Sequence, residues 1–224
     1  LLKKTGAVPT LPDLGLRGRA LKNLEEAILR PHGIILVTGP TGSGKTTTLY
    51  SVLARINTTK VNIVTVEDPV EYQIAGVNQV QINPAAGLTF ASGLRSFLRQ
   101  DPNIIMVGEV RDEEPAELAV QAALTGHLVF STLHTNSAAG ALPRLLDMKA
   151  EPYLLASTIT AIVGQRVARK ICQHCKKPYQ PTNEVVEDIK KVLGKLWVPP
   201  TPVQLFKGEG CNECGNTGYL GRVG

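Results

Sequence analysis

The segment GPTGSGKT, Gly39 to Thr46, is the feature that most restricts the folds open to this 224-residue chain. It fits the pattern G-x4-G-K-[ST] and stands between an apolar stretch, GIILV, and a helix-forming one, TTTLYSVLARI. Glycines let successive backbone N–H groups turn inward, and a helix N-terminus adds its dipole, so such a loop cradles phosphate oxygens. A chance glycine-rich turn, the alternative, would not explain the strand before it and the helix after it. The sequence therefore predicts a nucleoside triphosphate site on a strand–loop–helix unit.

The residues of this loop have separate expected roles. Lys45 should reach the β- and γ-phosphates, and the hydroxyl of Thr46 should bind Mg²⁺. Further nucleotide contacts are expected from the rest of the segment, namely Gly39, Pro40, Thr41, Gly42, Ser43, Gly44 and Thr47. The sequence thus predicts ATP and Mg²⁺ as cofactors.

Apolar strands alternate with helical segments through the middle of the chain. Four buried strands are expected at GIILV, VNIVTV, IIMV and LVFSTL. A helix should run from Leu21 to the residue before Pro31. Thr89 and Asn136 should cap two later helices, and Gly126 should close a third. Strands separated by helices predict an α/β fold with a parallel sheet covered on both faces.

Each expected strand ends in residues suited to chemistry. Glu67 and Glu109 follow two of the strands and His134 follows a third. Ligands collect at the carboxyl ends of parallel strands, and a phosphate-loop enzyme needs carboxylates there for Mg²⁺ and for the attacking water. Asp68 and Asp112 lie nearby, and for them a solvated or helix-capping role remains open. We therefore expect Glu67, Glu109 and His134 to meet at the phosphate loop.

Two histidines flank the strand LVFSTL. His134 follows it, and its imidazole can both donate and accept hydrogen bonds, so it could distinguish ATP from ADP. His127 precedes the strand. For His127 the sequence leaves open whether it senses a nucleotide or only stabilises the fold.

Four cysteines form two close pairs, CQHC at 172–175 and CNEC at 211–214. Four thiolates in two short loops suit tetrahedral Zn²⁺, so Cys172, Cys175, Cys211 and Cys214 are the expected ligands. His174, inside the first pair, is not expected to bind the metal. Disulfides are the main alternative, but they are rare in the reducing compartment where ATP-dependent enzymes work.

Composition argues against two classes of protein. The net charge is +5, but lysine and arginine are scattered and aromatic residues make up 4% of the chain, which gives little support for nucleic-acid binding. The longest apolar stretch, YLLASTITAIVG, is shorter than the roughly 18 to 20 residues that span a bilayer.

The sequence also predicts a division of the chain into three parts. We expect residues 1–20 to be a linker from a preceding domain, 21–165 an ATPase core, and 166–224 a zinc-binding subdomain truncated at its end.

Four segments, taken in order, resemble the secretion ATPase superfamily. They are RPHGIILVTGPTGSGKTTTLY, VTVEDPVEY, LRSFLRQDPNIIMVGEVRD and TGHLVFSTLHTNS, and they are similar to its Walker A, Asp-box, Walker B and His-box segments. The resemblance runs from about Leu11 to the last residue. The cysteine pairs resemble the tetracysteine element of pilus-assembly and type II secretion ATPases, which retraction ATPases typically lack. The resemblance implies a RecA-like phosphate-loop core followed by a small tetracysteine zinc subdomain.

The resemblance also implies roles for single residues. Glu67 would be the general base or water-orienting carboxylate, and Glu109 the Mg²⁺-linked Walker B acid. His127 and His134 would sense the nucleotide. Gly108 stands between the strand and Glu109, which leaves the division of work between the two glutamates open. One arginine would reach a neighbouring subunit's nucleotide, and three candidates lie near these segments: Arg95, Arg99 and Arg111.

At the level of the whole protein, the resemblance implies a homo-oligomeric ring, expected to be a hexamer. It would be cytoplasmic and peripheral at the inner membrane, where it would act on a platform protein and power pilus assembly or type II secretion. Two other functions remain open. A DNA-translocating or recombinase protein would bind DNA tightly and in a salt-dependent way, and a regulatory nucleotide switch would bind ATP without turnover.

Overall fold

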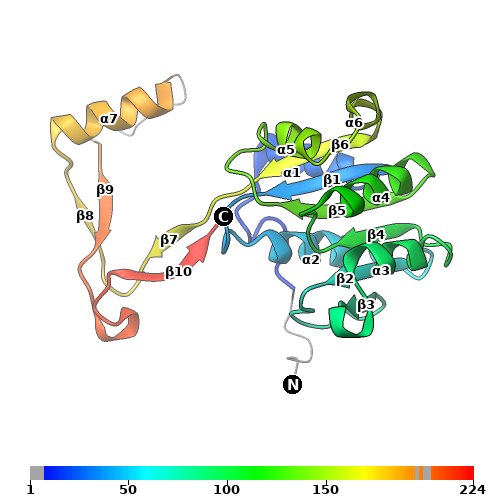
Figure 1. Ribbon diagram of the computed structural model, residues 1–224. Coiled ribbons are helices and arrows are strands. Elements are labelled where there is room, and N and C mark those ends of the chain that lie inside the picture. Colours follow the sequence, from blue (N-terminus) through cyan, green and yellow to red (C-terminus); the bar gives the residue numbers. More distant parts are fainter. Residues whose placement is uncertain (1–7, 195–196, 199–202) are drawn as a thin grey trace. The chain divides into compact units, whose positions relative to one another are not determined.

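The chain forms two compact units in the structure, a computed structural model that describes residues 8–194, 197–198 and 203–224. The first unit extends to Val167, and the second runs from Ala168 to Val223. The sequence pattern places the boundary after residue 165. Figure 1 shows the helices and strands of both units.

A six-stranded parallel sheet is the centre of the first unit. Its strand order is β3-β2-β4-β5-β1-β6. The strands are β1 (Gly33–Thr38), β2 (Ile63–Glu67), β3 (Asn78–Gln81), β4 (Ile104–Val107), β5 (Leu128–Leu133) and β6 (Ile159–Gly164). Every residue of β1, β2, β4 and β5 is buried, as expected for the central strands of a parallel sheet. The prediction of an α/β fold is confirmed.

Helices cover both faces of this sheet. One hydrophobic cluster joins it to α1 (Gly18–Ala27) and α2 (Lys45–Ile56). The other joins it to α3 (Phe90–Phe97), α4 (Glu113–Leu124), α5 (Ala141–Asp147) and α6 (Pro152–Thr158). Alternate residues of β1 belong to opposite clusters, because side chains of a strand point to alternate faces.

The predicted helix caps have different outcomes. Thr89 caps α3 as predicted, since its Oγ1 accepts a hydrogen bond from the Ser92 N–H at 3.2 Å. The prediction for Asn136 is wrong, because α5 begins four residues beyond the expected start and has Gly140 at its N-cap. Ser137 instead accepts a hydrogen bond from the Gly140 N–H at 3.1 Å. The loop after β5 is therefore longer than the sequence indicated.

Two strands of the sheet were not predicted. β3 is short and polar, and a 3-10 turn, η1 (Pro84–Ala86), follows it. β6 follows α6 within the single apolar stretch YLLASTITAIVG, so hydrophobicity alone did not separate helix from strand. Among the described residues, no helix is long and apolar enough to cross a membrane.

The segment before α1 belongs partly to the core. Leu11 is 2% exposed and packs with α1 and α2, although residues 1–20 were expected to be a linker. Helix α1 also begins earlier than predicted, at Gly18, and ends at Ala27. Residues 1–7 of the predicted linker lie outside the described part of the chain.

The described residues of the second unit form two antiparallel ribbons and one long helix. β7 (Ala168–Ile171) pairs with β10 (Tyr219–Val223), and β8 (Lys176–Tyr179) pairs with β9 (Leu205–Gly208). Helix α7 (Asn183–Leu193) follows β8, and a 3-10 turn, η3 (Asn212–Cys214), precedes β10. The cysteines lie in the turns that connect the two ribbons.

Candidate functional site

The phosphate loop connects β1 to α2, as predicted. Its glycines have positive φ angles, +150° at Gly39, +76° at Gly42 and +82° at Gly44, in a region that favours glycine. A Cβ at Gly39 would lie 2.4 Å from the carbonyl oxygen of Gln165 and 2.6 Å from Ser43 Oγ. The first glycine of the pattern is therefore required by close packing as well as by backbone conformation.

Lys45 lies across this loop. Its ammonium donates hydrogen bonds to the carbonyl oxygens of Gly39 at 3.0 Å and Pro40 at 3.2 Å, and the residue is 8% exposed. Burial lowers the pKa of Lys45, and the nearby charge of Glu109 acts in the opposite direction. A buried cation held by carbonyl groups can exchange them for the oxygens of an anion.

The hydroxyl of Ser43 supports an anion site in the same place. Ser43 is 3% exposed, and its Oγ has no hydrogen-bond partner among the described residues. Buried hydroxyl groups are usually hydrogen-bonded, so an orphan one in a glycine-rich loop suits a phosphate oxygen. Thr46 and Thr47 are half-buried at the start of α2, and Thr41 is exposed. The residues present therefore fit a bound phosphate.

Glu109 follows β4 and contacts His134, which follows β5. Its Oε1 lies 2.5 Å from Arg111 Nη2, and its Oε2 lies 3.3 Å from His134 Nε2. The Glu109 side chain is only 11% exposed. The hydrogen bond from Arg111 to Glu109, with the attraction of their charges, raises the pKa of Arg111. The structure thus places Glu109 and His134 together at the end of the sheet that carries Lys45.

Gly108 allows Glu109 to take this position. The Gly108 N–H donates to the carbonyl oxygen of Val66 at 2.8 Å, and a Cβ at Gly108 would lie 3.3 Å from that oxygen. On the other side, Thr132 Oγ1 donates to the Gly108 carbonyl at 2.8 Å. The glycine between strand and acid therefore lets the chain pass closely between β2 and β5.

Glu67 has a different environment from Glu109. It is 2% exposed, and Tyr50 donates a hydrogen bond from its hydroxyl to Glu67 Oε2. Thr65 Oγ1 and Gln79 Nε2 both donate to Glu67 Oε1, the latter at 3.1 Å. The pKa of Tyr50 is raised mainly by burial and, to a smaller extent, by the hydrogen bond to Glu67. Glu67 ends its strand as predicted, but both carboxylate oxygens are already occupied by protein donors.

His127 lies at the other end of β5 from His134. Its Nδ1 is 2.9 Å from the carbonyl oxygen of Ala122 and 3.1 Å from Thr125 Oγ1, at the end of α4. The six residues of β5 separate the two histidines by about 20 Å. The contacts of His127 are those of a residue that stabilises the fold, and its role as a nucleotide sensor stays a prediction.

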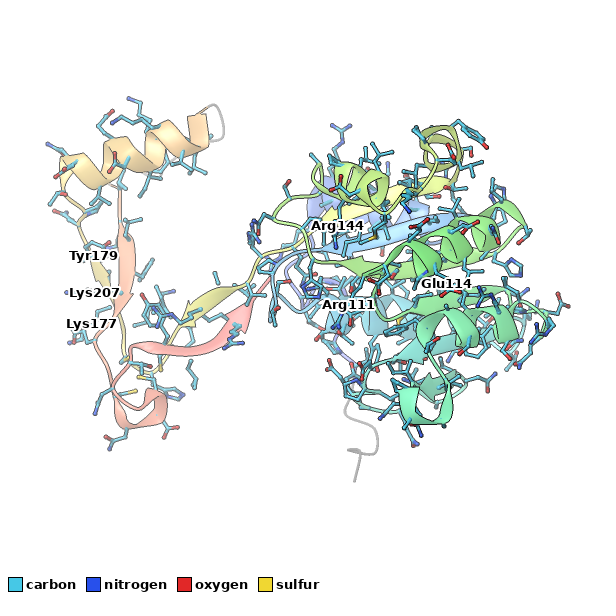
Figure 2. All side chains as sticks on the ribbon, viewed as in Figure 1. Arg111, Glu114, Arg144, Lys177, Tyr179 and Lys207 are labelled. Carbon is cyan, nitrogen blue, oxygen red and sulfur yellow. The ribbon has the colours of Figure 1, made fainter. Side chains whose placement is uncertain are left out.

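The three candidate arginines differ in their contacts. Arg95 forms an ion pair with Glu114, and Arg111 binds Glu109 in its own chain. Arg99 is exposed and has no ion pair in the part of the chain that the structure describes. Arg144, which the sequence did not single out, donates to the Arg111 carbonyl at 3.4 Å, and Figure 2 labels both.

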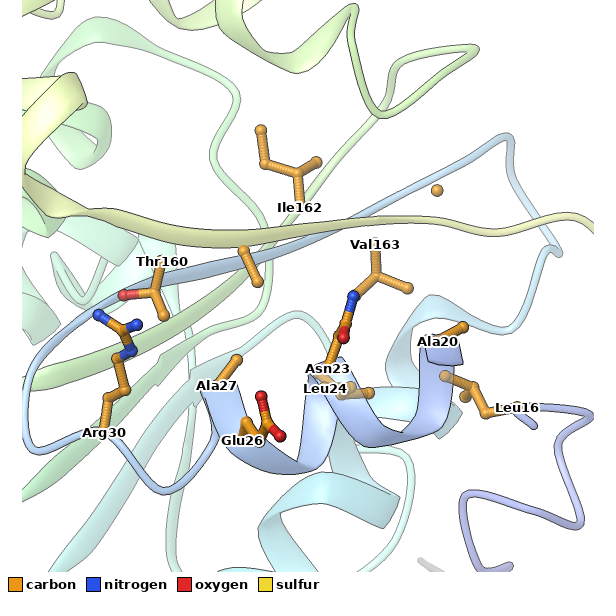
Figure 3. A pocket seen from close by; sticks show the side chains of 12 residues that line it. Leu16, Ala20, Asn23, Leu24, Glu26, Ala27, Arg30, Thr160, Ile162 and Val163 are labelled. Carbon is orange, nitrogen blue, oxygen red and sulfur yellow. The ribbon is translucent and has the colours of Figure 1, made fainter. Parts of the chain in front are cut away.

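A hollow of about 590 Å³ lies between α1 and β6 (Figure 3). Its charged lining groups, Glu26 and Arg30, have opposite signs. It therefore does not offer the excess of hydrogen-bond donors that the phosphate loop provides.

The four cysteines meet in the second unit. All are free, and their Sγ atoms lie within 4.8 Å of one another. Neighbouring sulfurs are 3.7 to 3.9 Å apart, close to the roughly 3.8 Å edge of a ZnS₄ tetrahedron with bonds of about 2.3 Å. A disulfide would require about 2.05 Å. The cluster is therefore compatible with Zn²⁺, and His174 is not a member of it.

Backbone groups prepare this cluster for a metal. Burial tends to raise the pKa of the Cys214 thiol, but the N–H groups of Cys211 and Gly218 and the neighbouring thiols outweigh it and lower that pKa to about 6. The two N–H groups lie 3.2 and 3.3 Å from Cys214 Sγ. Gly215 has a φ of +56° and permits the tight turn between Cys214 and Gly218. These donors favour the thiolate, which is the form that binds metals.

Comparison with known proteins agrees with this geometry. The family model described as type II/IV secretion system protein matches residues 1–224. The chain belongs to the type II/IV secretion system protein family. It is 51% identical over 224 residues to type II secretion system protein E of Pseudomonas aeruginosa, covering 100% of this chain and 43% of that protein.

Two further proteins are similar to this chain. Over 222 residues the chain is 50% identical to the type IV pilus assembly ATPase PilB of Thermus thermophilus, covering 99% of this chain and 24% of the relative. A crystal structure of the pilus retraction motor PilT with bound ADP has a TM-score of 0.68 and 41% identity, covering 76% of this chain and 52% of that one. The chain thus spans less than half of the two sequence relatives. The predicted family and RecA-like fold are confirmed.

His134 offers a test of nucleotide discrimination. We expect His134→Ala to weaken the binding of ATP relative to ADP by about 3- to 10-fold, because one hydrogen bond near the γ-phosphate contributes about 0.5–1.5 kcal/mol. Titration of both nucleotides against both proteins measures this ratio. His32→Ala, at an exposed position before β1, is the control. An equal loss for ATP and ADP would show that His134 is structural.

Proposed function

We propose that this chain is the ATP-hydrolysing part of a ring-forming motor that powers pilus assembly or type II protein secretion. The observation that carries the proposal is that Lys45, in the loop after β1, and Glu109, after β4, lie at the same edge of the parallel sheet. The hydroxyl of Ser43 in that loop is buried and has no hydrogen-bond partner among the described residues. The printed names of the relatives, a pilus assembly ATPase and a type II secretion protein, support the biological setting.

The phosphate loop binds the nucleotide in this proposal. Lys45 exchanges its loop carbonyls for the β- and γ-phosphates, and the backbone of Gly39 to Thr47 and Ser43 Oγ surround them. Thr46 and Glu109 would hold Mg²⁺, which when bound neutralises phosphate charge.

Glu109 and Glu67 have different proposed roles in hydrolysis. Glu109 and His134 are in contact at the edge of the sheet that carries the loop, where His134 would donate to an oxygen of ATP or of the attacking water. Glu67 is the candidate general base, but it must first release the hydroxyl of Tyr50. We infer that Glu67 is inactive in the conformation observed and that exchange of the Tyr50 contact accompanies turnover.

The assembled protein is proposed to be a homo-hexamer. It would be cytoplasmic, peripheral at the inner membrane, and attached there to a platform protein of the pilus or secretion machine. Of the three candidate arginines, Arg99 is the one that is exposed and makes no ion pair among the described residues, so we propose that it serves a neighbouring subunit. Charge supplied from a neighbour raises the rate by about 10³ to 10⁵ in other phosphate-loop enzymes.

Turnover should therefore depend on protein concentration. We expect the specific rate of phosphate release from Mg-ATP to rise as the chain is concentrated, in step with the appearance of oligomers by mass measurement. Arg99→Ala should remove the rise, and Arg55→Ala, an exposed arginine paired with Glu25, is the control. ATP binding without turnover at any concentration would identify a nucleotide switch and contradict the motor.

We propose that the cysteine cluster binds Zn²⁺. Cys172→Ser should lower the zinc content from one ion per chain to near zero, because three thiolates and a hydroxyl bind zinc more weakly than four thiolates. The change should also destabilise the second unit, because the binding of a structural zinc ion stabilises the folded chain. His174→Ala, in the same turn but outside the cluster, should keep its zinc. Elemental analysis of both variants tests this, and unchanged zinc in Cys172→Ser would contradict the site.

A further inference from the structure

Gln165 contacts the start of the phosphate loop through its backbone. It directly follows β6, and its N–H donates to the carbonyl oxygen of Thr38, the last residue of β1, at 2.8 Å. Its own carbonyl oxygen lies 2.4 Å from the position that a Cβ on Gly39 would occupy. Gln165 thus packs tightly against the first residue of the loop.

The side chain of Gln165 reaches the other end of the same loop. Its Oε1 accepts a hydrogen bond from Thr48 Oγ1 at 2.7 Å, and Thr48 is fully buried in the first turn of α2. Its Nε2 lies 3.0 Å from the position of a Cβ on Gly44, where the loop passes into the helix. A single residue therefore connects both ends of the loop to the end of β6.

This connection has a physical consequence for phosphate binding. The three loop glycines have wide conformational freedom, so ordering the loop around a phosphate costs entropy. A contact that holds the loop in shape before binding removes part of that cost. Loss of the Gln165 contact should weaken the binding of every nucleotide that uses the loop. The reason is that the contact is made at Gly39 and Thr48, and not where His134 is expected to meet the γ-phosphate.

We propose that Gln165 is a positioning residue of the phosphate loop, which ties the first turn of α2 to the end of β6 and keeps the loop in the shape that a nucleoside di- or triphosphate requires. The proposal rests on the proposed function, since it assigns a further residue to the same site. It predicts a change in affinity that is equal for ADP and ATP, which separates Gln165 from a group that reads the γ-phosphate.

The experiment is a double-mutant cycle on this contact. Gln165→Ala and Thr48→Val should each weaken the binding of Mg-ATP and of ADP by about 3- to 10-fold, which is the effect expected from the loss of one hydrogen bond. KM should rise by a similar factor, while kcat at saturating ATP stays close to that of the parent. The double variant should bind no more weakly than the weaker single variant, because both changes remove the same bond. Thr48→Ser, which keeps the hydroxyl, should restore binding.

A matched control separates positioning from general loss of stability. Thr158 is 3% exposed and donates from Oγ1 to the Leu154 carbonyl at 2.7 Å, so Thr158→Val removes a comparable buried hydrogen bond elsewhere in the first unit. Its nucleotide affinity should equal that of the parent. Weakening of the same size in Thr158→Val would overturn the proposal.

Two other outcomes would separate an error in the positioning role of Gln165 from an error in the proposed function. If Lys45→Ala abolishes binding while Gln165→Ala binds as the parent does, or if the Gln165 and Thr48 effects add fully, the positioning role is wrong and the proposed function stands. If the parent does not bind nucleotide, or Lys45→Ala binds it equally well, the proposed function itself is wrong. Fluorescence titration with a labelled nucleotide distinguishes these cases.

Discussion

Lys45→Ala is expected to abolish ATP hydrolysis and to weaken nucleotide binding by about 100-fold or more. Hydrogen bonds to charged groups contribute about 1.5–3 kcal/mol each, and Lys45 is expected to make more than one to the phosphates. About 3 kcal/mol corresponds to roughly two factors of ten in affinity. The fold should remain, because the ammonium is bonded in this structure to two loop carbonyls that water can replace.

The control for this change is Lys60→Ala, at an exposed position before β2. Circular dichroism and thermal melting of both variants should match the parent. Phosphate release and nucleotide affinity are then compared at equal protein concentration. Turnover of Lys45→Ala close to that of Lys60→Ala would show that the loop does not carry the reaction.

Glu109→Gln is expected to lower turnover by roughly 10²-fold while nucleotide binding is largely retained. The amide has the same shape as the carboxylate, but it lacks the negative charge that Arg111, His134 and Lys45 face. Electrostatic and acid–base contributions to catalysis are typically of this size. Single-turnover kinetics at saturating nucleotide measures the chemical step without the contribution of binding.

Glu114→Gln provides the matched control. Glu114 is an exposed acid paired with an arginine, Arg95, as Glu109 is paired with Arg111. An ion pair so exposed contributes little, so turnover of Glu114→Gln should stay near that of the parent. If Glu109→Gln also retains the parent rate in a protein that forms oligomers, Glu109 has no part in the chemistry.

Local features of the site could be predicted from the sequence. The phosphate loop is one continuous segment, and Glu109 and His134 each follow a strand whose direction the α/β pattern specifies. Parallel strands bring such residues to one edge of the sheet without any knowledge of side-chain packing. The cysteine cluster was likewise predictable, because two close pairs of thiols have few other uses.

Contacts between distant parts of the chain could not be predicted in this way. Gln165 and Thr48 are 117 residues apart, and their hydrogen bond depends on β6 lying next to β1. The donors around Glu67 have the same origin, since Gln79 belongs to β3, a polar strand with no hydrophobic alternation. Spacing predicted which end of the sheet Glu67 occupies, but it could not predict that Tyr50 would bind its carboxylate.

The most direct test of a nucleotide site in this loop is to follow the backbone amide resonances of the first unit as Mg-ATP is added. The N–H groups of Gly42, Gly44 and Lys45 should show the largest shifts and should saturate at one nucleotide per chain, because a phosphate bound in the loop would accept hydrogen bonds from them. The same titration of Lys45→Ala should leave them nearly unchanged. Unperturbed loop amides in the parent, with shifts concentrated around the hollow between α1 and β6, would contradict the proposed site.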